Sequence, residues 1–386
     1  MNNFYSYNPT KIIFGRGSIS LIRNEMKNEK KILLLCGKES IKKNGVLEQI
    51  RKALQDKEVI EFFGIEQNPD IETCMKALEI ARKENIEFIL AAGGGSVIDA
   101  AKYIALAFYY EKKDPWQILL KNETEPNRVL PFGCIQTVPG SGTEFNNAFV
   151  LSNRSKKLKI SFYSHKLYPR FSVLDPETTF TLSQKQTAFG IVDMFVHVLE
   201  QYITWPRKAP LQDRLGEALL VTIKEIAHDL LANPNDYELR ATSMWCAAQA
   251  ASGQLSRGVP TDWATHFIGH EITALYDLTH AQTLALILGG VWEWNFEYKK
   301  KMLAQYANRV WGMVGDEDLL AKMAIIETDN FFESLGVPTR FSSLSLDAKK
   351  VAADVISNLS KREFTPLGEN RSININAIKE IILSRS

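Results

Sequence analysis

The chain has 386 residues, of which 45% are hydrophobic and 24% are charged, and its formal net charge is +1. These values are typical of a globular protein with enough apolar residues for two domains. A net charge near zero does not attract nucleic acid or an anionic membrane surface. The longest apolar runs, around 104–110 and 284–291, are shorter than the roughly 20 residues of a membrane span. We therefore expect neither nucleic acid nor a membrane as a partner.

The first half of the chain alternates predicted strands and helices. Apolar runs at 31–36, 87–92 and 129–137 predict strands, and helical spacing at 46–54 and 97–108 predicts helices between them. Since the strand runs are apolar on both faces, they predict a parallel sheet that helices cover on both sides.

From about Ser183 onward the pattern is helical only. The spacing of apolar residues predicts helices at 184–203, 211–232, 237–254, 262–276, 283–309 and 317–335. We therefore predict an α/β domain over residues 1–178 and an all-helical domain over residues 179–386.

A run of glycines separates the second predicted strand from the helix that follows it, in Gly93-Gly94-Gly95-Ser96. Glycines let the backbone approach a phosphate, and a helix start offers N–H groups and a positive dipole end. Ser96 is the predicted N-cap, with Asp99 three residues later as in a capping box. A tight strand-to-helix turn is the alternative, but three consecutive glycines are more than such a turn needs. The loop Thr137–Glu144, rich in hydroxyls and glycine, follows the third strand and adds hydrogen-bonding groups for a cofactor.

Histidines and one aspartate recur at helical spacing in the second half. Asp193 and His197 are four residues apart, as are His266 and His270, and His280 follows after a short link. Residues four apart share one face of a helix. Imidazoles with one carboxylate suit iron or zinc, whereas calcium and magnesium prefer oxygen ligands. Ordinary hydrogen-bonded histidines are the alternative, but an unpaired Asp193 in so apolar a helix would be costly, which favours a metal.

Together these motifs resemble the iron-containing (group III) alcohol dehydrogenases, in the branch of butanol dehydrogenases and NADPH-dependent aldehyde reductases. The resemblance extends over essentially the whole chain and rests on Asn8–Gly15, Gly93–Lys102, Thr137–Glu144, Val173–Pro176, Val192–Tyr202, Asp262–His270, His280–Gln282 and Leu367–Asn370. It implies a Rossmann-like α/β dinucleotide-binding domain with a parallel sheet, as in dehydroquinate synthase, and an all-α metal-binding domain.

The resemblance also implies site residues. The metal ligands would be Asp193, His197, His266 and His280, all of which are present. The residues along the cofactor would be Gly94, Gly95, Ser96, Asp99, Thr137, Ser141 and Lys159. His270 matches a family position proposed for proton transfer, and a packing histidine is the alternative.

The chain departs from the aldehyde-reductase branch after its first strand. The branch carries a run of glycines there, whereas this chain reads Gly37-Lys38-Glu39-Ser40. NAD-preferring relatives place an aspartate at the position of Lys38, and a lysine there suits the 2′-phosphate of NADP instead. The carboxylate of the neighbouring Glu39 favours NAD instead. The loop Gly37, Lys38 and Ser40 therefore favours NADP, with NAD as the alternative.

The implied activity is a metal-dependent alcohol dehydrogenase or aldehyde reductase, which transfers hydride between NAD(P)H and a small aldehyde or primary alcohol, with one Fe²⁺ or Zn²⁺. A glycerol-type polyol dehydrogenase or an NAD-dependent cyclase of the same fold is the alternative, and the intact Asp193 and His197 pair with Gln201-Tyr202 favours the dehydrogenase. A homodimer is expected. The four scattered cysteines and the absence of a signal-peptide pattern predict a cytoplasmic protein.

Overall fold

The computed structural model describes residues 1–121, 123–206 and 208–386. The chain forms two compact units. The α/β unit comprises Tyr7–Ser183 and Asn233–Ser252, and the helical unit comprises Met1–Ser6, Gln184–Ala232 and Gly253–Ser386. Helix α9 (Tyr237–Ala250) belongs to the α/β unit, while the domain boundary after residue 178 stays a prediction.

A six-stranded sheet in the order β1-β8-β5-β4-β2-β3 forms the centre of the α/β unit, and every pair of neighbours in it is parallel. Its strands are β1 Lys11–Phe14, β2 Lys31–Cys36, β3 Glu58–Phe62, β4 Phe88–Gly94, β5 Phe132–Val138 and β8 Phe171–Leu174. Strands β6 (Ala148–Asn153) and β7 (Leu158–Tyr163) form a separate antiparallel pair. The predicted parallel sheet is confirmed, and β5 begins only after Pro131, which has no N–H to donate.

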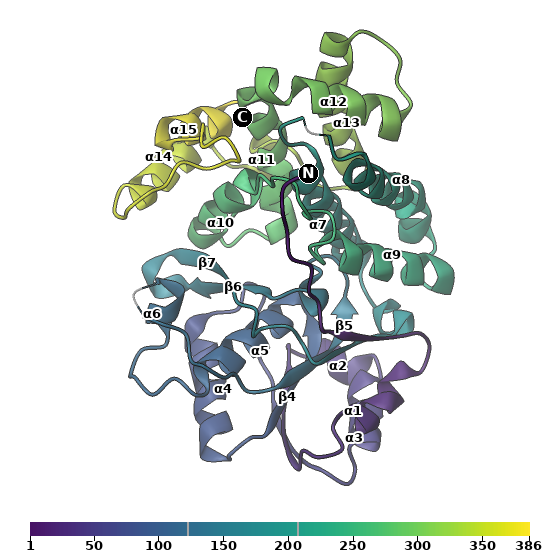
Figure 1. Ribbon diagram of the computed structural model, residues 1–386, viewed down its shortest axis with the longest axis vertical. Coiled ribbons are helices and arrows are strands. Elements are labelled where there is room, and N and C mark those ends of the chain that lie inside the picture. Colours follow the sequence, from purple (N-terminus) through teal and green to yellow (C-terminus); the bar gives the residue numbers. More distant parts are fainter. Residues whose placement is uncertain (122, 207) are drawn as a thin grey trace. The chain divides into compact units, whose positions relative to one another are not determined.

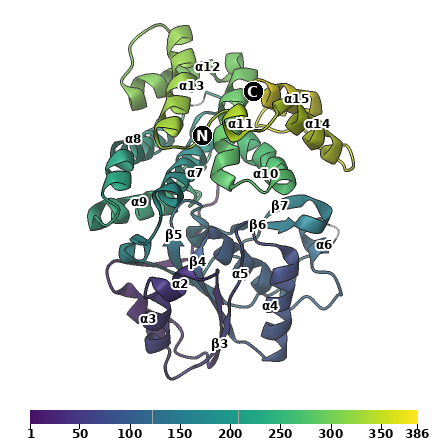
Figure 2. The ribbon, with the colours of Figure 1, turned by 180° about the vertical axis from the view of Figure 1, so that it is seen from behind.

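Alternate residues of each strand point to opposite faces of this sheet, and helices bury both faces. On β2, Leu33 and Leu35 pack with helices on one side, and Ile32 and Leu34 pack with helices on the other. Figures 1 and 2 show α4 and α5 on the first side and α1 and α3 on the second. The helices of this unit are α1 Ile22–Glu25, α2 Ser40–Lys43, α3 Val46–Ala53, α4 Ile71–Lys83, α5 Gly95–Ala107, α6 Trp116–Leu119 and α9.

The helical unit is built around α11, which is buried on all sides from Thr283 to Trp292 and contacts α7, α10, α13 and α15 (Figure 1). A helix that is apolar all round belongs in a core. The helices of this unit are α7 Gln184–Tyr202, α8 Pro210–Ala232, α10 Ala264–Tyr276, α11 His280–Trp294, α12 Phe296–Trp311, α13 Glu317–Ser334, α14 Ala348–Leu359 and α15 Ile375–Leu383.

Two features of the helical unit differ from the sequence prediction. The helix predicted at 283–309 is two helices, α11 and α12, separated at Asn295, whose buried side chain accepts a hydrogen bond from Ser372 Oγ at 2.7 Å. Helices α14 and α15 were not predicted, and they pack against α10 and α11 respectively.

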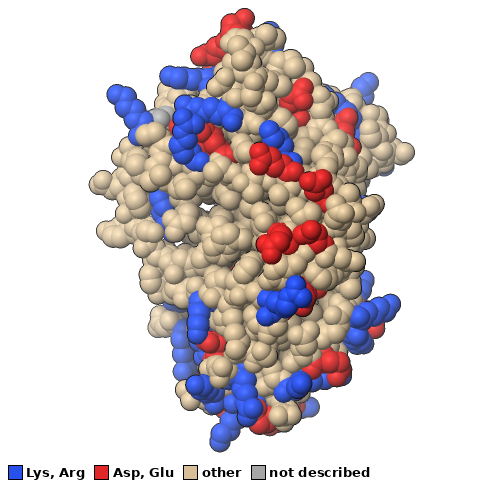
Figure 3. Space-filling view, turned by 90° about the vertical axis from the view of Figure 1, so that its right-hand side faces the viewer, with Lys and Arg blue, Asp and Glu red and all other residues tan. Residues whose placement is uncertain are grey.

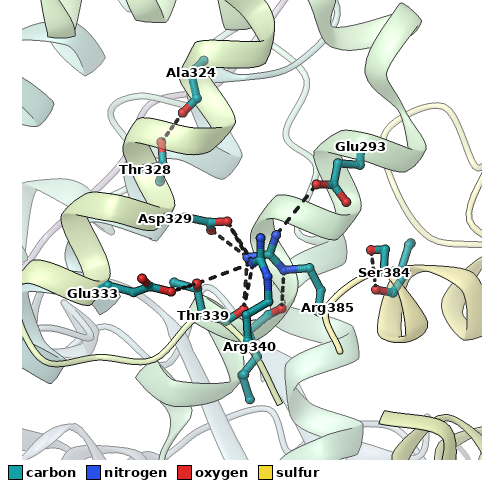
Figure 4. Close-up of polar contacts among 11 residues, drawn as sticks. Glu293, Ala324, Thr328, Asp329, Glu333, Thr339, Arg340, Ser384 and Arg385 are labelled. Carbon is teal, nitrogen blue, oxygen red and sulfur yellow. Dashed lines mark hydrogen bonds and ion pairs between the residues drawn. The ribbon is translucent and has the colours of Figure 1, made fainter. Parts of the chain in front are cut away.

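The end of the chain is held by a buried arginine. Figure 4 shows the guanidinium of Arg385 against Asp329 of α13, at 2.7 and 2.8 Å from its two carboxylate oxygens. Arg385 also donates to the carbonyl oxygen of Leu286 in α11. Gly289 and Gly290 leave room for the Arg385 side chain, since a Cβ on Gly289 would lie 2.5 Å from an Arg385 nitrogen. Residues near the C-terminus therefore join α11 to α13.

The surface carries charges of both signs. On the face that Figure 3 shows, lysine and arginine side chains are interspersed with aspartate and glutamate. Within the described ranges, no helix combines the length and the apolar character needed to cross a bilayer.

Candidate active site

Three of the predicted metal ligands converge in the helical unit. One ligand atom each from Asp193, His266 and His280 lies within 4.8 Å of the others. Asp193 Oδ1 is 3.4 Å from His197 Nδ1 and 3.8 Å from His280 Nε2, and the rings of His197 and His266 are 4.7 Å apart between centroids. The structure therefore brings one carboxylate and three imidazoles together from α7, α10 and α11.

The donor atoms of this cluster fit a divalent cation. Asp193 Oδ1 and His197 Nδ1 are buried, and neither makes a hydrogen bond in the part of the chain that the structure describes. Burial lowers the pKa of His197, although the Asp193 carboxylate opposes this. The neutral imidazole is the form that coordinates a metal. A carboxylate and three imidazoles are a donor set for iron or zinc.

His280 and His270 are held by local structure. His280 is the first residue of α11, whose start is capped by a hydrogen bond from the Thr279 amide to Gln282 Oε1 at 3.3 Å. His270 is buried on α10, one turn after His266, and its ring is 5.2 Å from that of His280. His270 therefore lies beside the cluster.

The backbone at the start of α10 is strained. Trp263 precedes this helix with φ of +64°, a left-handed conformation that bulky residues rarely adopt. Its ring lies 5.2 Å from that of His266. Such strain costs of order 1–3 kcal/mol and is concentrated at functional sites.

A carboxylate that the sequence analysis did not select contacts one of these histidines. Glu200 of α7 meets His266 Nδ1 through Oε2 and accepts the Thr265 amide through Oε1 at 2.7 Å. Burial, followed by the nearby Asp262 carboxylate, raises the pKa of Glu200, and the Thr265 amide lowers it. A second acid on the same helix as Asp193, three residues after His197, is the sequence signal that could have identified it.

In the α/β unit, several of the predicted dinucleotide residues lie at one edge of the sheet. Strands β2, β4 and β5 are adjacent and parallel, so their carboxyl ends meet at the same edge. Gly37 and Lys38 follow β2, Gly94 and Gly95 lie where β4 meets α5, and Thr137 is in β5. This edge is where open α/β sheets bind their ligands.

The glycines at this edge are required by close packing. A Cβ on Gly94 would lie 2.8 Å from Val138 Cβ, and one on Gly95 would lie 2.4 Å from Ser141 Oγ. That hydroxyl is buried and makes no hydrogen bond among the described residues. An unsatisfied hydroxyl at the start of a 13-residue helix, whose first N–H groups have no partner in the helix, fits a bound phosphate.

Two details of the predicted glycine loop are wrong. Ser96 is not an N-cap, because α5 begins at Gly95 with Gly94 as its N-cap, so Ser96 lies inside the first turn. Asp99 does not complete a capping box. Its carboxylate accepts the Thr143 hydroxyl at 2.7 Å and the Val150 amide at 3.0 Å.

Beneath the second loop lies a buried lysine that the sequence analysis did not select. Lys102 donates from Nζ to the carbonyl oxygens of Thr143, Asn146 and Ala148 and to the side-chain oxygens of Thr143 and Asn146, at 2.6–3.0 Å. Burial lowers the pKa of Lys102 to about 8, and burial raises that of Asp99 to about 6. Asp99 and Lys102, three residues apart in a helix whose other residues after Ser96 are mostly apolar, are the signal that could have identified this network.

The remaining predicted residues lie on different elements. Lys159 of β7 is buried and donates to Asn68 Oδ1 at 2.9 Å, and Asn68 is a residue that the sequence analysis missed. Lys38 and Ser40 are exposed. Glu39 pairs with Lys42 at 3.0 Å on the short helix α2.

Comparison with known proteins identifies the family. The family model described as iron-containing alcohol dehydrogenase matches residues 9–176, and the C-terminal model of the Fe-containing alcohol dehydrogenase family matches residues 187–385. The chain is 44% identical over 383 residues to the NADPH-dependent aldehyde reductase YqhD of Escherichia coli, covering 99% of each protein. It is 38% identical over 393 residues to the probable NADH-dependent butanol dehydrogenase 1 of Bacillus subtilis, covering 100% of this chain and 98% of the relative.

Solved structures agree with this assignment. The crystal structure of Escherichia coli YqhD has a TM-score of 0.97 at 42% identity and covers 100% of this chain and 99% of that one. The NADH-dependent butanol dehydrogenase A of Thermotoga maritima has a TM-score of 0.95 at 32% identity, with the same coverage. The chain therefore belongs to the iron-containing alcohol dehydrogenase family and is an NAD(P)H-dependent alcohol dehydrogenase or aldehyde reductase.

Proposed function

We propose that this enzyme reduces small aldehydes to primary alcohols with NADPH, using one divalent cation, Fe²⁺ or Zn²⁺, held by Asp193, His197, His266 and His280. The observation that carries the proposal is the convergence of ligand atoms from Asp193, His266 and His280 within 4.8 Å of one another. His197 joins them as the fourth ligand, through its place 3.4 Å from Asp193.

The residues of the cluster have separate roles. Asp193 supplies the negative charge that offsets part of the cation's charge, and the neutral imidazoles supply nitrogen donors. When bound, the cation provides a Lewis acid for the carbonyl oxygen of the aldehyde, and the nicotinamide provides the hydride. The alcohol also needs a proton on that oxygen, and His270 is placed beside His280 to deliver it, directly or by passing it from water. A packing role for His270 is the alternative.

The dinucleotide is assigned to the carboxyl edge of the sheet. Its binding residues are Gly37, Lys38, Ser40, Gly94, Gly95, Ser96, Thr137, Ser141 and Lys159, with Asp99 acting through Thr143. The orphaned Ser141 hydroxyl beside Gly95 supports a phosphate there. We also propose a domain boundary after residue 178, a homodimer and a cytoplasmic location, the last on the four scattered cysteines.

Removal of the metal tests the proposal. Protein stripped of metal with a chelator is expected not to oxidise NADPH when butyraldehyde is added, as followed by NADPH absorbance. Addition of Fe²⁺ or Zn²⁺ is expected to restore this activity. The thermal transition of the stripped protein should fall, since a ligand that binds only the folded state stabilises it. Full turnover without metal would refute the proposal. A cyclase of the same fold would consume no reduced cofactor in this assay.

The choice of cofactor is tested at Lys38. Replacing Lys38 with aspartate is expected to raise the KM for NADPH about tenfold and to lower that for NADH, because a charge-assisted contact with the 2′-phosphate is worth roughly 1.5 kcal/mol. Glu39 is already paired with Lys42, so its effect on a phosphate at Lys38 is reduced.

Lys27→Asp is the matched control for this measurement. Lys27 is exposed in the turn before the amino end of β2, whereas Lys38 follows its carboxyl end. The control makes the same change of charge and should leave both KM values within about twofold. Equal KM shifts in the two variants would contradict the NADP assignment.

A further inference from the structure

Glu200 is the only buried acid of α7 besides Asp193, and it points at a proposed metal ligand. Oε2 contacts His266 Nδ1, Oε1 accepts the Thr265 amide at 2.7 Å, and the backbone oxygen accepts the Asp262 amide at 2.9 Å. One residue of α7 thus holds the segment that leads into α10 at three points.

The segment that Glu200 holds is anchored from its other side too. Asp262 Oδ1 accepts a hydrogen bond from the Ala264 amide at 3.0 Å, and the Asp262 carboxylate lies 2.6 Å from the buried ammonium of Lys299 on α12. Lys299 also contacts Glu369 at 3.0 Å and donates to the Ile203 carbonyl at 2.7 Å. With its backbone fixed in this way, His266 can be oriented by a single hydrogen bond to its ring.

We propose that Glu200 is a positioning residue that keeps the proton of His266 on Nδ1 and so presents Nε2 to the cation. An imidazole has one nitrogen for a proton and one for a metal, and the partner of the first decides which is which. This inference rests on the proposed metal site, but the tautomer of His266 can be measured without a metal.

Glu200→Gln is the sharpest variant because it keeps shape and removes one acceptor. The amide has one oxygen for two donors, the Thr265 N–H and the His266 Nδ1–H. If the oxygen stays on Thr265, the NH₂ group faces Nδ1, which must then accept, and the ring proton moves to Nε2. If the amide turns over, the NH₂ group faces the Thr265 N–H instead. The first arrangement changes the tautomer of His266, and the second leaves the Thr265 N–H without its acceptor.

The experiment uses the whole chain in its metal-free form. Zn²⁺ affinity is measured by competition with a chelator, and the Co²⁺-loaded protein gives an absorption spectrum that reports ligand geometry. Loss of an outer carboxylate partner is expected to weaken Zn²⁺ binding about 10- to 100-fold and to shift the Co²⁺ bands. Selective ¹⁵N-histidine labelling is expected to show the His266 proton on Nδ1 in the wild-type chain, and on Nε2 in the variant if its amide oxygen stays on the Thr265 N–H.

Glu217→Gln is the matched control. Glu217 is also a buried carboxylate, it accepts from Tyr202 of α7 at 2.8 Å, and it contacts Arg309 at 2.7 Å. Its replacement should change the thermal transition but leave Zn²⁺ affinity and the Co²⁺ spectrum unaltered. Unchanged Zn²⁺ affinity and an unchanged His266 tautomer in Glu200→Gln would overturn the inference. Wild-type protein that binds no Zn²⁺ would overturn the proposed function alone, and its Nδ1 tautomer would still support the role of Glu200.

Discussion

The Asp193→Ala variant is expected to reduce aldehydes at least about 1,000-fold more slowly than the wild-type chain, because a Lewis acid contributes several kcal/mol and each tenfold in rate is about 1.4 kcal/mol. Asp193 provides the carboxylate among the proposed ligands, so its loss removes the charge that holds a dication. Turnover of butyraldehyde and metal content by elemental analysis measure the two effects together.

The same variant is expected to remain folded, which separates it from a merely unstable protein. Asp193 Oδ1 is buried without a hydrogen bond in the described structure, and an unsatisfied carboxylate oxygen in such a place is unfavourable. Metal-free Asp193→Ala should therefore melt no lower than metal-free wild type. It should also bind NADPH normally, since the proposed dinucleotide residues lie in the α/β unit and Asp193 in the helical unit. Asp193→Asn, which keeps the shape, should lose metal as well. Normal metal content in both variants would contradict the assignment.

Periodicity was enough to predict the positions of residues within one helix. The four-residue spacing of Asp193 and His197, and of His266 and His270, placed each pair on one face of α7 and of α10, as the structure has them. Spacing along the chain carries no information about packing between helices. Glu200 lies 66 residues from His266 in sequence, so their contact follows from how α7 meets α10.

Helix ends were predicted less well, because they too depend on contacts with other parts of the fold. Ser96 has the residue type of an N-cap, but α5 begins two residues earlier than that predicts, at Gly95, where Gly94 and Gly95 leave room for Val138 and Ser141. The apolar spacing continues through Asn295, where no proline or glycine stands, and at the break the Asn295 side chain accepts a hydrogen bond from Ser372, which spacing cannot predict. Helix α15 packs on α11, where glycines accommodate the arginine that follows it.

Replacing Lys102 with methionine is expected to destabilise the α/β unit by about 3–5 kcal/mol, the usual cost of removing one member of a buried charge network. The variant leaves five oxygens without their donor, together with the nearby Asp99 carboxylate. A loss of this size lowers a thermal transition by roughly 10 °C in a unit of this length. Differential scanning calorimetry measures it, and Lys76→Met, at an exposed position of α4, is the control.

The double variant Asp99→Asn/Lys102→Met should recover part of this loss, because it removes the acid that the single variant leaves buried. Metal binding should be unchanged in both, while NADPH binding should weaken, since Lys102 holds the loop that places Ser141 against Gly95. A lowered pKa is common in catalytic lysines, and a pKa of about 8 could suggest such a role here. The ammonium of Lys102 has three N–H groups, and these already face five protein oxygens, so no donor is left for a substrate. The lowered pKa of Lys102 therefore reflects its burial in the fold. Normal stability in Lys102→Met would show instead that this ammonium is dispensable to the loop.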